Sequence, residues 1–577
     1  MAHNEKLTKG SLANGDSGSG RDVVEELEYA EPRYGQQGVS KEVSGVNEED
    51  DPNVHQHIDF RLFVSLVAMS FLWVGSQIPL YLYGSVLPLI YSEIGGANGR
   101  YVWMVIGYLI PNAALCPFVG ALSDMFGRRL VAVAGQMLLI LGPVVVSTAH
   151  SINVAIGGMV LAGLGAGLNE LIALAGTSEL VPVRKRSAYV GGIVATILPF
   201  CPSAVWAQLI ARESNWRWVG LLVGLWNFVG LVLVLLFYKD PVRNTPVRPK
   251  KEILSELDYI GAILSIGGAL CFMMVLLAKR ACFGAIHHRP LHGDRLFFWE
   301  GLYAKQPIAP WKMFSKDART MVLILVITFF SGGNFFVLLL FWPTQAYNMY
   351  GVNPVAIGIR TLPIGFGIIG GATIALVFIG ITRGRTTSLM IFWCTLMTAF
   401  TGAMSVATTQ NLYPTVYPIL LFASIGVGAV IIPCSIIAQI VCPTELIGTI
   451  TAITLSVRYI GGAVGFTAYY NVFFHKFQLY AQSVGVTIIE EGIVAPTNLK
   501  VVEELVVLAG QARYQLLKEL IATSPDIGMK ATAFDKIIAA TQEAYAYAYR
   551  WPYWISIAFG GICLLCSFGL RDVRRFM

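Results

Sequence analysis

The stretch Gly120–Arg129 has the sequence GALSDMFGRR and lies between two long apolar runs, residues 101–121 and 130–148. A run of about 20 apolar residues is long enough for a helix that spans a bilayer. We therefore interpret the stretch as a polar hairpin that joins the end of one membrane helix to the start of the next. The rest of the chain is best understood from this hairpin outward.

Each polar or small residue of the hairpin suits such a position. Gly120 is expected to let two helices approach closely, Asp124 places an acid at a helix end, and Gly127 permits a tight turn. Arg128 and Arg129 form a cation pair of the kind that stays on the cytoplasmic side of a membrane. We expect Asp124 and the two arginines to act together as a cytoplasmic gate between helices.

The composition predicts a membrane protein. Of the 577 residues, 55% are hydrophobic and 13% are charged, and the mean hydropathy is +0.62. A soluble protein has about 25% charged residues. We expect an all-α polytopic membrane protein with the lipid bilayer as its surroundings. No basic block indicates a nucleic-acid partner, the nine cysteines show no metal-ligand spacing, and no catalytic constellation appears, so neither an enzyme nor a cofactor is expected.

About thirteen apolar runs have spanning length. They are residues 62–90, 101–121, 130–148, 152–175, 187–211, 216–238, 258–278, 320–342, 354–379, 386–407, 414–440, 446–472 and 551–570. The loops after the second, fourth and sixth runs are rich in Lys and Arg, as is the C-terminal tail. Because cytoplasmic loops carry the excess of basic residues, these loops and both termini are predicted to be cytosolic.

An odd number of spans conflicts with two termini on one side. The conflict lies between residues 279 and 310, where Lys279–Arg295 carries too much charge and histidine for a bilayer-spanning helix. Either a short segment near Leu296–Ala304 re-enters the membrane, or a helix has been lost.

A carboxylate inside a span is costly and is treated as a functional hypothesis. Glu170 follows Asn169, and Gly163 and Gly167 share its helix face. Small residues allow close helix packing, so Glu170 is expected to point into the bundle. We interpret Glu170, with Asn169, as a proton-coupling or substrate-contacting site. A carboxylate that is hydrogen-bonded for structural reasons is the alternative.

Two arginines also lie in apolar surroundings. Arg458 precedes Gly461 and Gly465 and is expected on the same side of the helix as this G-x-x-x-G pair. It is expected to pair with an acid or with an anionic group of the substrate, and a structural ion pair is the other interpretation. Arg360 lies nearer the end of a span and is a further candidate for contact with protons or substrate.

Kinks and uncharged polar groups add to a predicted central cavity. Pro199 and Pro202 are expected to bend the fifth span. The polar candidates are Asn112, Gln136, Gln208, Asn227 and Asn334. The many aromatic residues suit a bulky apolar ligand, although most are expected to face lipid or the membrane interface.

Several of these segments resemble a known family. The hairpin resembles the signature loop between spans two and three of the major facilitator superfamily. The segments 163–211 and 215–233, LDYIG at 257–261 and VRYIGGAVG at 457–465 resemble the fungal trichothecene efflux pumps, a fourteen-span branch. The resemblance implies two six-helix bundles plus two linker spans, related as inverted repeats.

The resemblance also implies a function. The family exports toxins or xenobiotics by alternating access, driven by the proton motive force. A small hydrophobic substrate, protons as coupling ion, a monomer and the plasma membrane are therefore expected, with a vacuolar or vesicle membrane as the other location. Siderophore–iron import by proton symport, found in a related fourteen-span family, is the first alternative. A transport-inactive pseudo-carrier is the second, if the eighth span is absent.

Some positions depart from the family pattern. Met125 replaces the usual basic residue after Asp124, and Met159 stands where many proton antiporters have an arginine. The Gly-Pro motif of antiporter span five is also missing. Glu170 is therefore the better candidate to carry the proton.

The family pattern bears on the anomalous segment as well. Residues 297–300 and 306–314 resemble the end of the eighth span and the loop after it, whereas residues 279–295 replace the body of that span. We interpret 279–295 as a mis-spliced or frame-shifted stretch.

These observations divide the chain into six regions. They are a disordered cytosolic tail (1–59), an N-terminal six-helix bundle (60–240), a linker region with one clear span and the anomalous segment (241–316), five spans of the C-terminal bundle (317–472), a long extracellular or lumenal loop (473–549), and the last span with a cytosolic tail (550–577). The long loop is expected to contain amphipathic helices that pack on the outer face.

Overall fold

The computed structural model describes residues 60–96, 99–181, 186–239, 310–382, 385–443 and 446–575. Within these ranges the chain is helical, and the one β-bridge joins Val494 to Ile527. Twelve helices of this part are long and apolar enough to span a membrane. The all-α polytopic fold expected from the sequence is confirmed.

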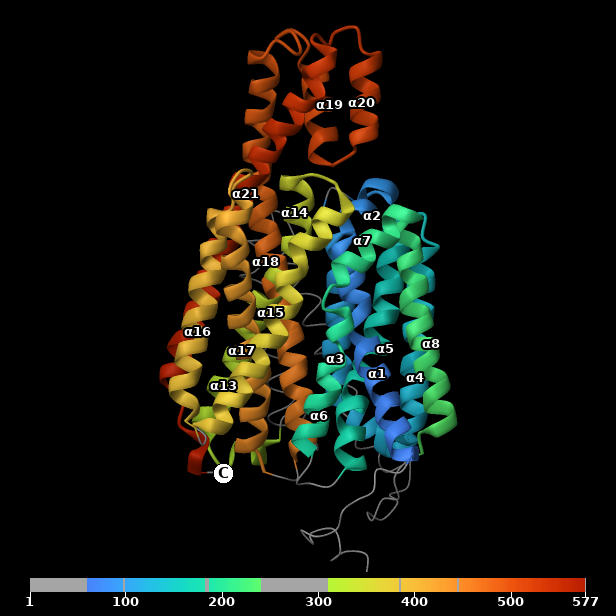
Figure 1. Ribbon diagram of the computed structural model, residues 1–577, viewed down its shortest axis with the longest axis vertical. Helices are drawn as coiled ribbons and strands as arrows, with labels where there is room; N and C mark the ends of the chain where they lie inside the picture. Colours follow the sequence, from blue (N-terminus) through green and yellow to red (C-terminus); the bar gives the residue numbers. More distant parts are fainter. Residues whose placement is uncertain are drawn as a thin grey trace, which may run out of the picture. The chain divides into compact units, whose positions relative to one another are not determined.

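The first bundle contains six of these spans (Figure 1). Its helices are α1 (Phe60–Ser85), α3 (Val102–Phe126), α4 (Arg128–Ser147), α5 (Ile152–Leu180), α6 (Arg186–Ala195) with α7 (Ser203–Glu213), and α8 (Val219–Phe237), and the short α2 (Leu87–Ile94) follows α1. The six apolar runs predicted before residue 240 correspond one by one to these spans.

The second bundle contains the other six spans. They are α13 (Ala318–Phe336) with α14 (Trp342–Tyr350), α15 (Pro354–Ile381), α16 (Thr386–Ala403), α17 (Tyr417–Val441), α18 (Ile447–Glu490) and α21 (Lys530–Phe568). The apolar run 258–278, the anomalous segment 279–310 and the N-terminal tail 1–59 lie outside the described residues, apart from Pro310.

Two spans are interrupted where proline removes a backbone donor. In the fifth span, Pro199 lies in a short 3-10 segment and Pro202 precedes the first residue of α7, so the helix is broken rather than merely bent. In the seventh span, Val337–Phe341 forms a π-helical segment directly before Pro343. Such segments are frequent at functional sites of membrane helices.

The segment 473–549, predicted as a long loop with helical patterning, begins and ends within helices. Helix α18 continues without interruption to Glu490, and α21 already begins at Lys530. The sequence between the apolar run of α18 and Gly485 has no proline or glycine that would end a helix, and polar composition alone does not end one. The two helices therefore carry their spans beyond the apolar region.

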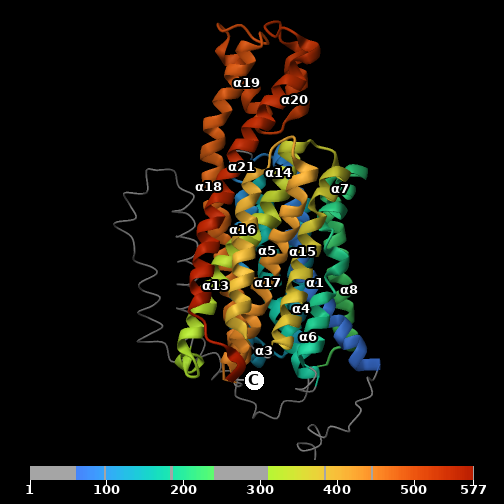
Figure 2. The same cartoon turned by 60° about the vertical axis from the view of Figure 1, so that its left-hand side comes forward.

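The extensions of α18 and α21 form an outer helical domain together with α19 (Leu499–Gly510) and α20 (Tyr514–Thr523) (Figures 1 and 2). The domain has a hydrophobic core of its own, distinct from the core of the two bundles, and Leu505, Leu517 and Ile537 are fully buried there. The predicted amphipathic helices thus pack mainly on one another.

Different elements lie at the two ends of the bundles. The described C-terminus lies at the end where α6 begins, whereas α2, α14, α19 and α20 lie at the opposite end (Figure 1). The charge rule predicts that the first of these ends faces the cytosol, and the outer helical domain is then expected at the extracellular or lumenal end.

Close helix packing in the first bundle depends on small residues. A Cβ atom on Gly163 would lie 2.4 Å from the Tyr108 carbonyl oxygen of α3, and one on Gly167 would lie 3.1 Å from the Asn112 carbonyl oxygen. Helix α5 therefore packs against α3 along the glycine face, as the sequence indicated.

Candidate functional site

The hairpin Gly120–Arg129 has the turn that its sequence predicts. Helix α3 ends at Phe126 and α4 begins at Arg128, and Gly127 between them has a φ of 85°, a backbone conformation that favours glycine. Arg129 donates a hydrogen bond to the Leu235 carbonyl group at the end of α8. The hairpin is thereby fixed to the last helix of the first bundle.

One expectation for the hairpin was wrong. Among the described residues, a Cβ atom on Gly120 would meet nothing within 4 Å, so no described helix approaches closely at this glycine. Met125 is buried. The side chain of Asp124 lies outside the described residues, and its role in a gate with Arg128 and Arg129 stays a prediction.

The centre of the molecule holds an ion pair between the two bundles. An Arg458 Nη2 group on α18 donates to Glu170 Oε1 of α5 at 3.0 Å, and the Tyr459 hydroxyl donates to Glu170 Oε2 at 2.6 Å. The side chain of Glu170 is fully buried and that of Arg458 is 17% exposed. Both carboxylate oxygens thus have a partner on the opposite bundle. Two residues selected separately from the sequence form one site.

The surroundings of Glu170 are polar on the side of the first bundle. Tyr81, Tyr108 and Cys116 lie close enough to interact electrostatically with its carboxylate. The Tyr81 hydroxyl donates to Gln77 Oε1 at 3.2 Å. The carboxylate therefore lies among hydroxyl and thiol groups rather than among hydrocarbon alone.

Helix α3 lies between the elements that carry the pair. It packs against α5 on one side and α18 on the other, and Ser456 Oγ of α18 donates to the Ala113 carbonyl group of α3 at 2.5 Å. Glu170 is one turn beyond the glycines that contact α3. Its side chain can therefore reach α18 past the edge of that helix.

The G-x-x-x-G pair of α18 does not share the environment of Arg458. Cβ atoms on Gly461 and Gly465 would lie 2.0 Å and 2.5 Å from backbone atoms of Phe329 and Gly333 on α13. These glycines therefore pack α18 within its own bundle, whereas the Arg458 side chain extends to the other bundle.

Asn169 points away from Glu170. With its amide oriented to suit its neighbours, the side chain donates to the Ala132 carbonyl group and accepts from the Gln136 N–H group of α4, both at 3.1 Å. These two groups would pair with each other in an undisturbed helix. Asn169 therefore links α5 to α4, and the structure does not place it in the Glu170 centre.

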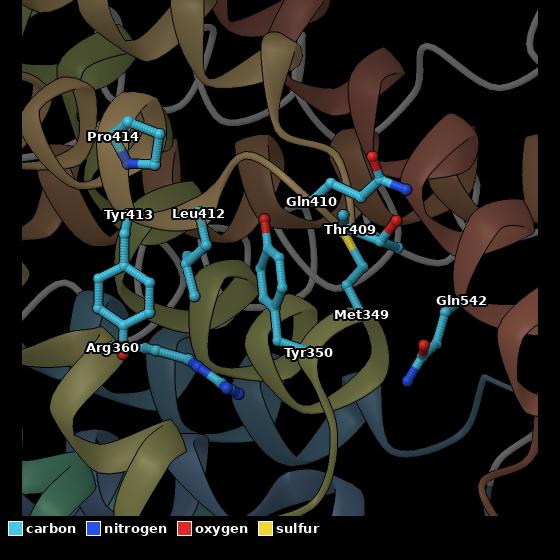
Figure 3. Close-up of a pocket in the computed structure, with 9 residues that line it drawn as sticks. All are labelled: Met349, Tyr350, Arg360, Thr409, Gln410, Leu412, Tyr413, Pro414 and Gln542. Carbon is cyan, nitrogen blue, oxygen red and sulfur yellow. The ribbon is translucent and has the colours of Figure 1, made fainter.

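Arg360 lies away from the Glu170 centre. It lies near the start of α15, where its guanidinium carbon is 5.5 Å from the centre of the Tyr350 ring. It lines a cavity of about 340 Å³ at the outer ends of α14, α15 and α21, and Met349, Tyr413 and Gln542 also line this cavity (Figure 3). The structure does not bring Arg360 together with Glu170.

An aromatic contact that sequence reasoning missed closes the outer end between the bundles. The rings of Tyr101 on the first bundle and Tyr470 on α18 have centres 5.4 Å apart, and Tyr91 lies 4.7 Å from Tyr101. A Cβ atom on Gly99 would lie 2.9 Å from the Tyr470 hydroxyl oxygen. We call Tyr91, Gly99, Tyr101 and Tyr470 the outer aromatic contact. The tyrosine-rich composition was visible in the sequence, but not which rings meet.

The comparison with protein families fits this arrangement. The sequence profile described as Major Facilitator Superfamily matches residues 65–466. The chain belongs to the Major Facilitator Superfamily. Its twelve described spans fit the two six-helix bundles of the superfamily fold.

Curated relatives include fungal transporters of the same superfamily. The chain is 28% identical to the MFS-type transporter pydD of Acremonium sp. over 329 residues, which are 55% of this chain and 56% of that protein. It is 22% identical to the trichothecene efflux pump TRI12 of Fusarium sporotrichioides, over 90% of this chain and 87% of the pump. The MFS-type efflux transporter pyiT of Pyricularia grisea is 23% identical, over 92% of this chain and 87% of that protein. The match with pydD thus spans little more than half of each chain.

Solved structures of the superfamily share the fold. A bacterial homologue of the human lysosomal transporter Spinster, in an inward-facing and unoccupied conformation, aligns with a TM-score of 0.57 and 14% identity. The alignment covers 90% of this chain and 98% of that one. At this identity the similarity shows the fold alone.

The Glu170 centre is the candidate functional site in the described part of the chain. Within the described residues, no group of three or more His, Cys, Asp or Glu side chains is placed to hold a metal ion. A buried carboxylate with a guanidinium and a phenol across a bundle interface is able to exchange a proton or an ionic partner. Either exchange changes how strongly the two bundles hold together.

Proposed function

We propose that this transporter exports hydrophobic toxins or xenobiotics by alternating access, driven by the proton motive force across the plasma membrane. The proposal is carried by one observation, namely that the Glu170 carboxylate has both of its oxygens bonded to the opposite bundle. The full-length relatives named as efflux pumps support the direction of transport.

The geometry suggests how a proton acts. The Tyr459 hydroxyl occupies Oε2, so a proton arriving at the carboxylate competes with Arg458 at Oε1. A neutral carboxyl group holds the guanidinium much less strongly, because a charge-assisted hydrogen bond is about twice as strong as a neutral one. Protonation of Glu170 therefore loosens the contact between α5 and α18.

Alternating access follows from this loosening. The superfamily operates by rocking one bundle against the other around a site at the midplane. With Glu170 ionised, the pair holds α5 and α18 together. With Glu170 protonated, the bundles separate more easily, and Arg458 becomes available to a polar group of the substrate. The protein works as a monomer in this scheme, since both halves of the site belong to one chain.

The direction of transport is tested by flux. We measure a labelled trichothecene and a labelled ferric siderophore in a transporter-deleted fungal host that expresses this chain, with and without an uncoupler. Toxin efflux that the uncoupler abolishes is expected. Net siderophore uptake without toxin efflux would replace the proposal by siderophore import, and absence of both fluxes would favour a pseudo-carrier.

The role of Glu170 is tested in the same assay. Glu170→Gln keeps the size of the side chain but cannot ionise. Efflux at least ten times slower, with its dependence on external pH lost, is expected. Asn169→Ala is the matched control. Asn169 is next to Glu170 in the sequence, but its side chain contacts α4 instead of α18. Unchanged flux and pH dependence in Glu170→Gln would remove Glu170 from the mechanism.

A further inference from the structure

The cavity near Arg360 is separate from the Glu170 centre and has no part in the scheme above. It measures about 340 Å³ and is partly open. Its lining comes from the end of α14, the start of α15, the segment 409–414 and Gln542 on α21 (Figure 3). A volume of this order is typical of small-molecule sites, which measure about 300–1,000 Å³.

Two of the residues that line the cavity, Arg360 and Tyr350, have hydrogen-bond donors without acceptors among the described residues. Arg360 Nε and Nη1 are shielded from solvent, and within the described residues neither has a hydrogen-bond partner. The same holds for the hydroxyl groups of Tyr350 and Tyr417. Arg360 and Tyr350 both line the cavity, and Arg360 interacts electrostatically with both of these tyrosines. Buried donors of this kind are normally satisfied, and an exception needs an explanation.

The donors share one chemical character. A guanidinium has N–H groups only and accepts no hydrogen bond, so it requires an acceptor. No carboxylate in the described part of the chain forms an ion pair with Arg360. Its guanidinium lies over the Tyr350 ring. A planar guanidinium matches an oxyanion with two parallel hydrogen bonds.

The walls beside Arg360 are aromatic. Tyr350 lies next to the guanidinium, and Tyr413 stacks on Tyr417 with ring centres 5.3 Å apart and an angle of 14° between the rings. The exposed ring of Tyr413 leaves a flat surface at the cavity. A ligand with a flat apolar body finds contact area here in addition to the charge of Arg360.

We propose that this cavity binds a small organic anion, an aromatic carboxylate or a compound of similar shape, with its oxyanion on Arg360 and its ring against Tyr350 and Tyr413. A small rotation of the Arg360 side chain turns its unpaired N–H groups toward the ligand. The Tyr350 hydroxyl is a further unpaired donor at the cavity. The site is independent of the direction in which the transporter works.

The site also adjoins the contact between the bundles. In the turn before Arg360, a Cβ atom on Gly358 would lie 2.9 Å from the Val205 Cα atom of α7. Trp342 Nε1 donates to the Arg360 carbonyl group at 2.8 Å, which holds this turn against the seventh span. A bound anion is therefore expected to change how the start of α15 moves against α7.

The experiment uses the purified full chain in nanodiscs of phosphatidylcholine and benzoate as the probe, with benzamide as its neutral isostere. Binding is followed by saturation-transfer NMR. Saturable binding of benzoate, at least ten times tighter than that of benzamide, is expected. Arg360→Gln is expected to weaken benzoate binding at least tenfold, Arg360→Lys less, and Tyr350→Phe a few-fold.

Arg550→Gln is the matched control. Arg550 also lies against a tyrosine of the outer end, with its guanidinium carbon 4.7 Å from the centre of the Tyr547 ring, but it does not line the cavity. Its replacement is expected to leave benzoate binding unchanged. If Arg360→Gln is poorly folded, Arg360→Lys and Tyr350→Phe carry the test.

Three results would overturn the proposal. They are equal affinity for benzoate and benzamide, benzoate binding that none of the Arg360 and Tyr350 variants changes, and benzoate binding that is lost in nanodiscs containing phosphatidylglycerol. The last result would assign the cavity to a lipid head group.

Discussion

Two of the contacts between the bundles have opposite chemistry. At the midplane the Glu170 carboxylate joins Arg458 and Tyr459 through charge and hydrogen bonds. At the outer end Tyr101 and Tyr470 join the bundles through the faces and edges of aromatic rings. Both contacts use α18, about three helical turns apart. One proton changes the first contact, whereas the second has no charge to lose and depends on buried area and ring geometry.

The two contacts suit two different roles in transport. A contact that is sensitive to protonation suits a coupling site, because its strength follows the proton supply. An aromatic contact of constant strength suits a closure that opens only when the bundles rock. The following predictions break one contact without the other, from the largest expected effect to the smallest.

Removing only the cation of the midplane pair is expected to have the largest effect on stability. Arg458→Met leaves the fully buried Glu170 carboxylate without its cation, and loss of one partner of a buried pair costs about 3–5 kcal/mol. The double variant Arg458→Met with Glu170→Gln is expected to recover most of this loss. Denaturant unfolding in detergent measures the stability of the single and of the double variant. A double variant as unstable as the single one would show that the arginine acts by packing rather than by charge.

Asn169 is expected to contribute to stability but not to coupling. Asn169→Ala removes two hydrogen bonds to α4, and the freed groups of α4 pair with each other. The expected loss is about 1 kcal/mol, the usual net value of an internal hydrogen bond. The pH dependence of transport should stay that of the wild type, and a shifted pH profile would contradict the structural role.

The outer aromatic contact is expected to show a small direct coupling. A double-mutant cycle with Tyr101→Leu and Tyr470→Leu should give a coupling of about 0.5–1.5 kcal/mol, as for other aromatic pairs. The coupling should not depend on pH, because the contact is between the two rings. Additive effects of the two substitutions would show that the rings do not hold the bundles together.

The smallest effect is expected on the surface of the outer helical domain. Lys536 Nζ lies 2.5 Å from Glu491 Oε2, and both side chains are at least one-third exposed. An exposed ion pair contributes about 0–1 kcal/mol and is screened by salt. Lys536→Ala should therefore leave transport unchanged and lower stability by at most this amount. A loss of transport would show that the pair has a role beyond the domain's surface.

The sequence was sufficient for the spans and for the residues of the midplane site, but not for their pairing. Hydrophobic runs set the twelve described spans, because the bilayer fixes their length. Glu170 and Arg458 were conspicuous because each is charged within an apolar run. Their pairing depends on how α5 and α18 are placed across two bundles, and no local pattern encodes that.

Asn169 and Glu170 illustrate what the sequence could not predict. Asn169 and Glu170 are adjacent, yet a helix turns by about 100° per residue, so one side chain faces α4 and the other faces α18. Gly120 was expected at a close helix contact, and the structure leaves open space there. A small residue permits close packing but does not require it.

The continuity of α18 has a practical consequence. This helix has 44 residues and is therefore about 66 Å long, and it runs without interruption from the span that carries Arg458 into the outer helical domain. A tilt of about 10° in a rod of this length displaces its far end by about 11 Å. A fluorophore pair with one dye on the outer domain and one on the first bundle would therefore display each cycle of the transporter outside the membrane as a change in energy transfer.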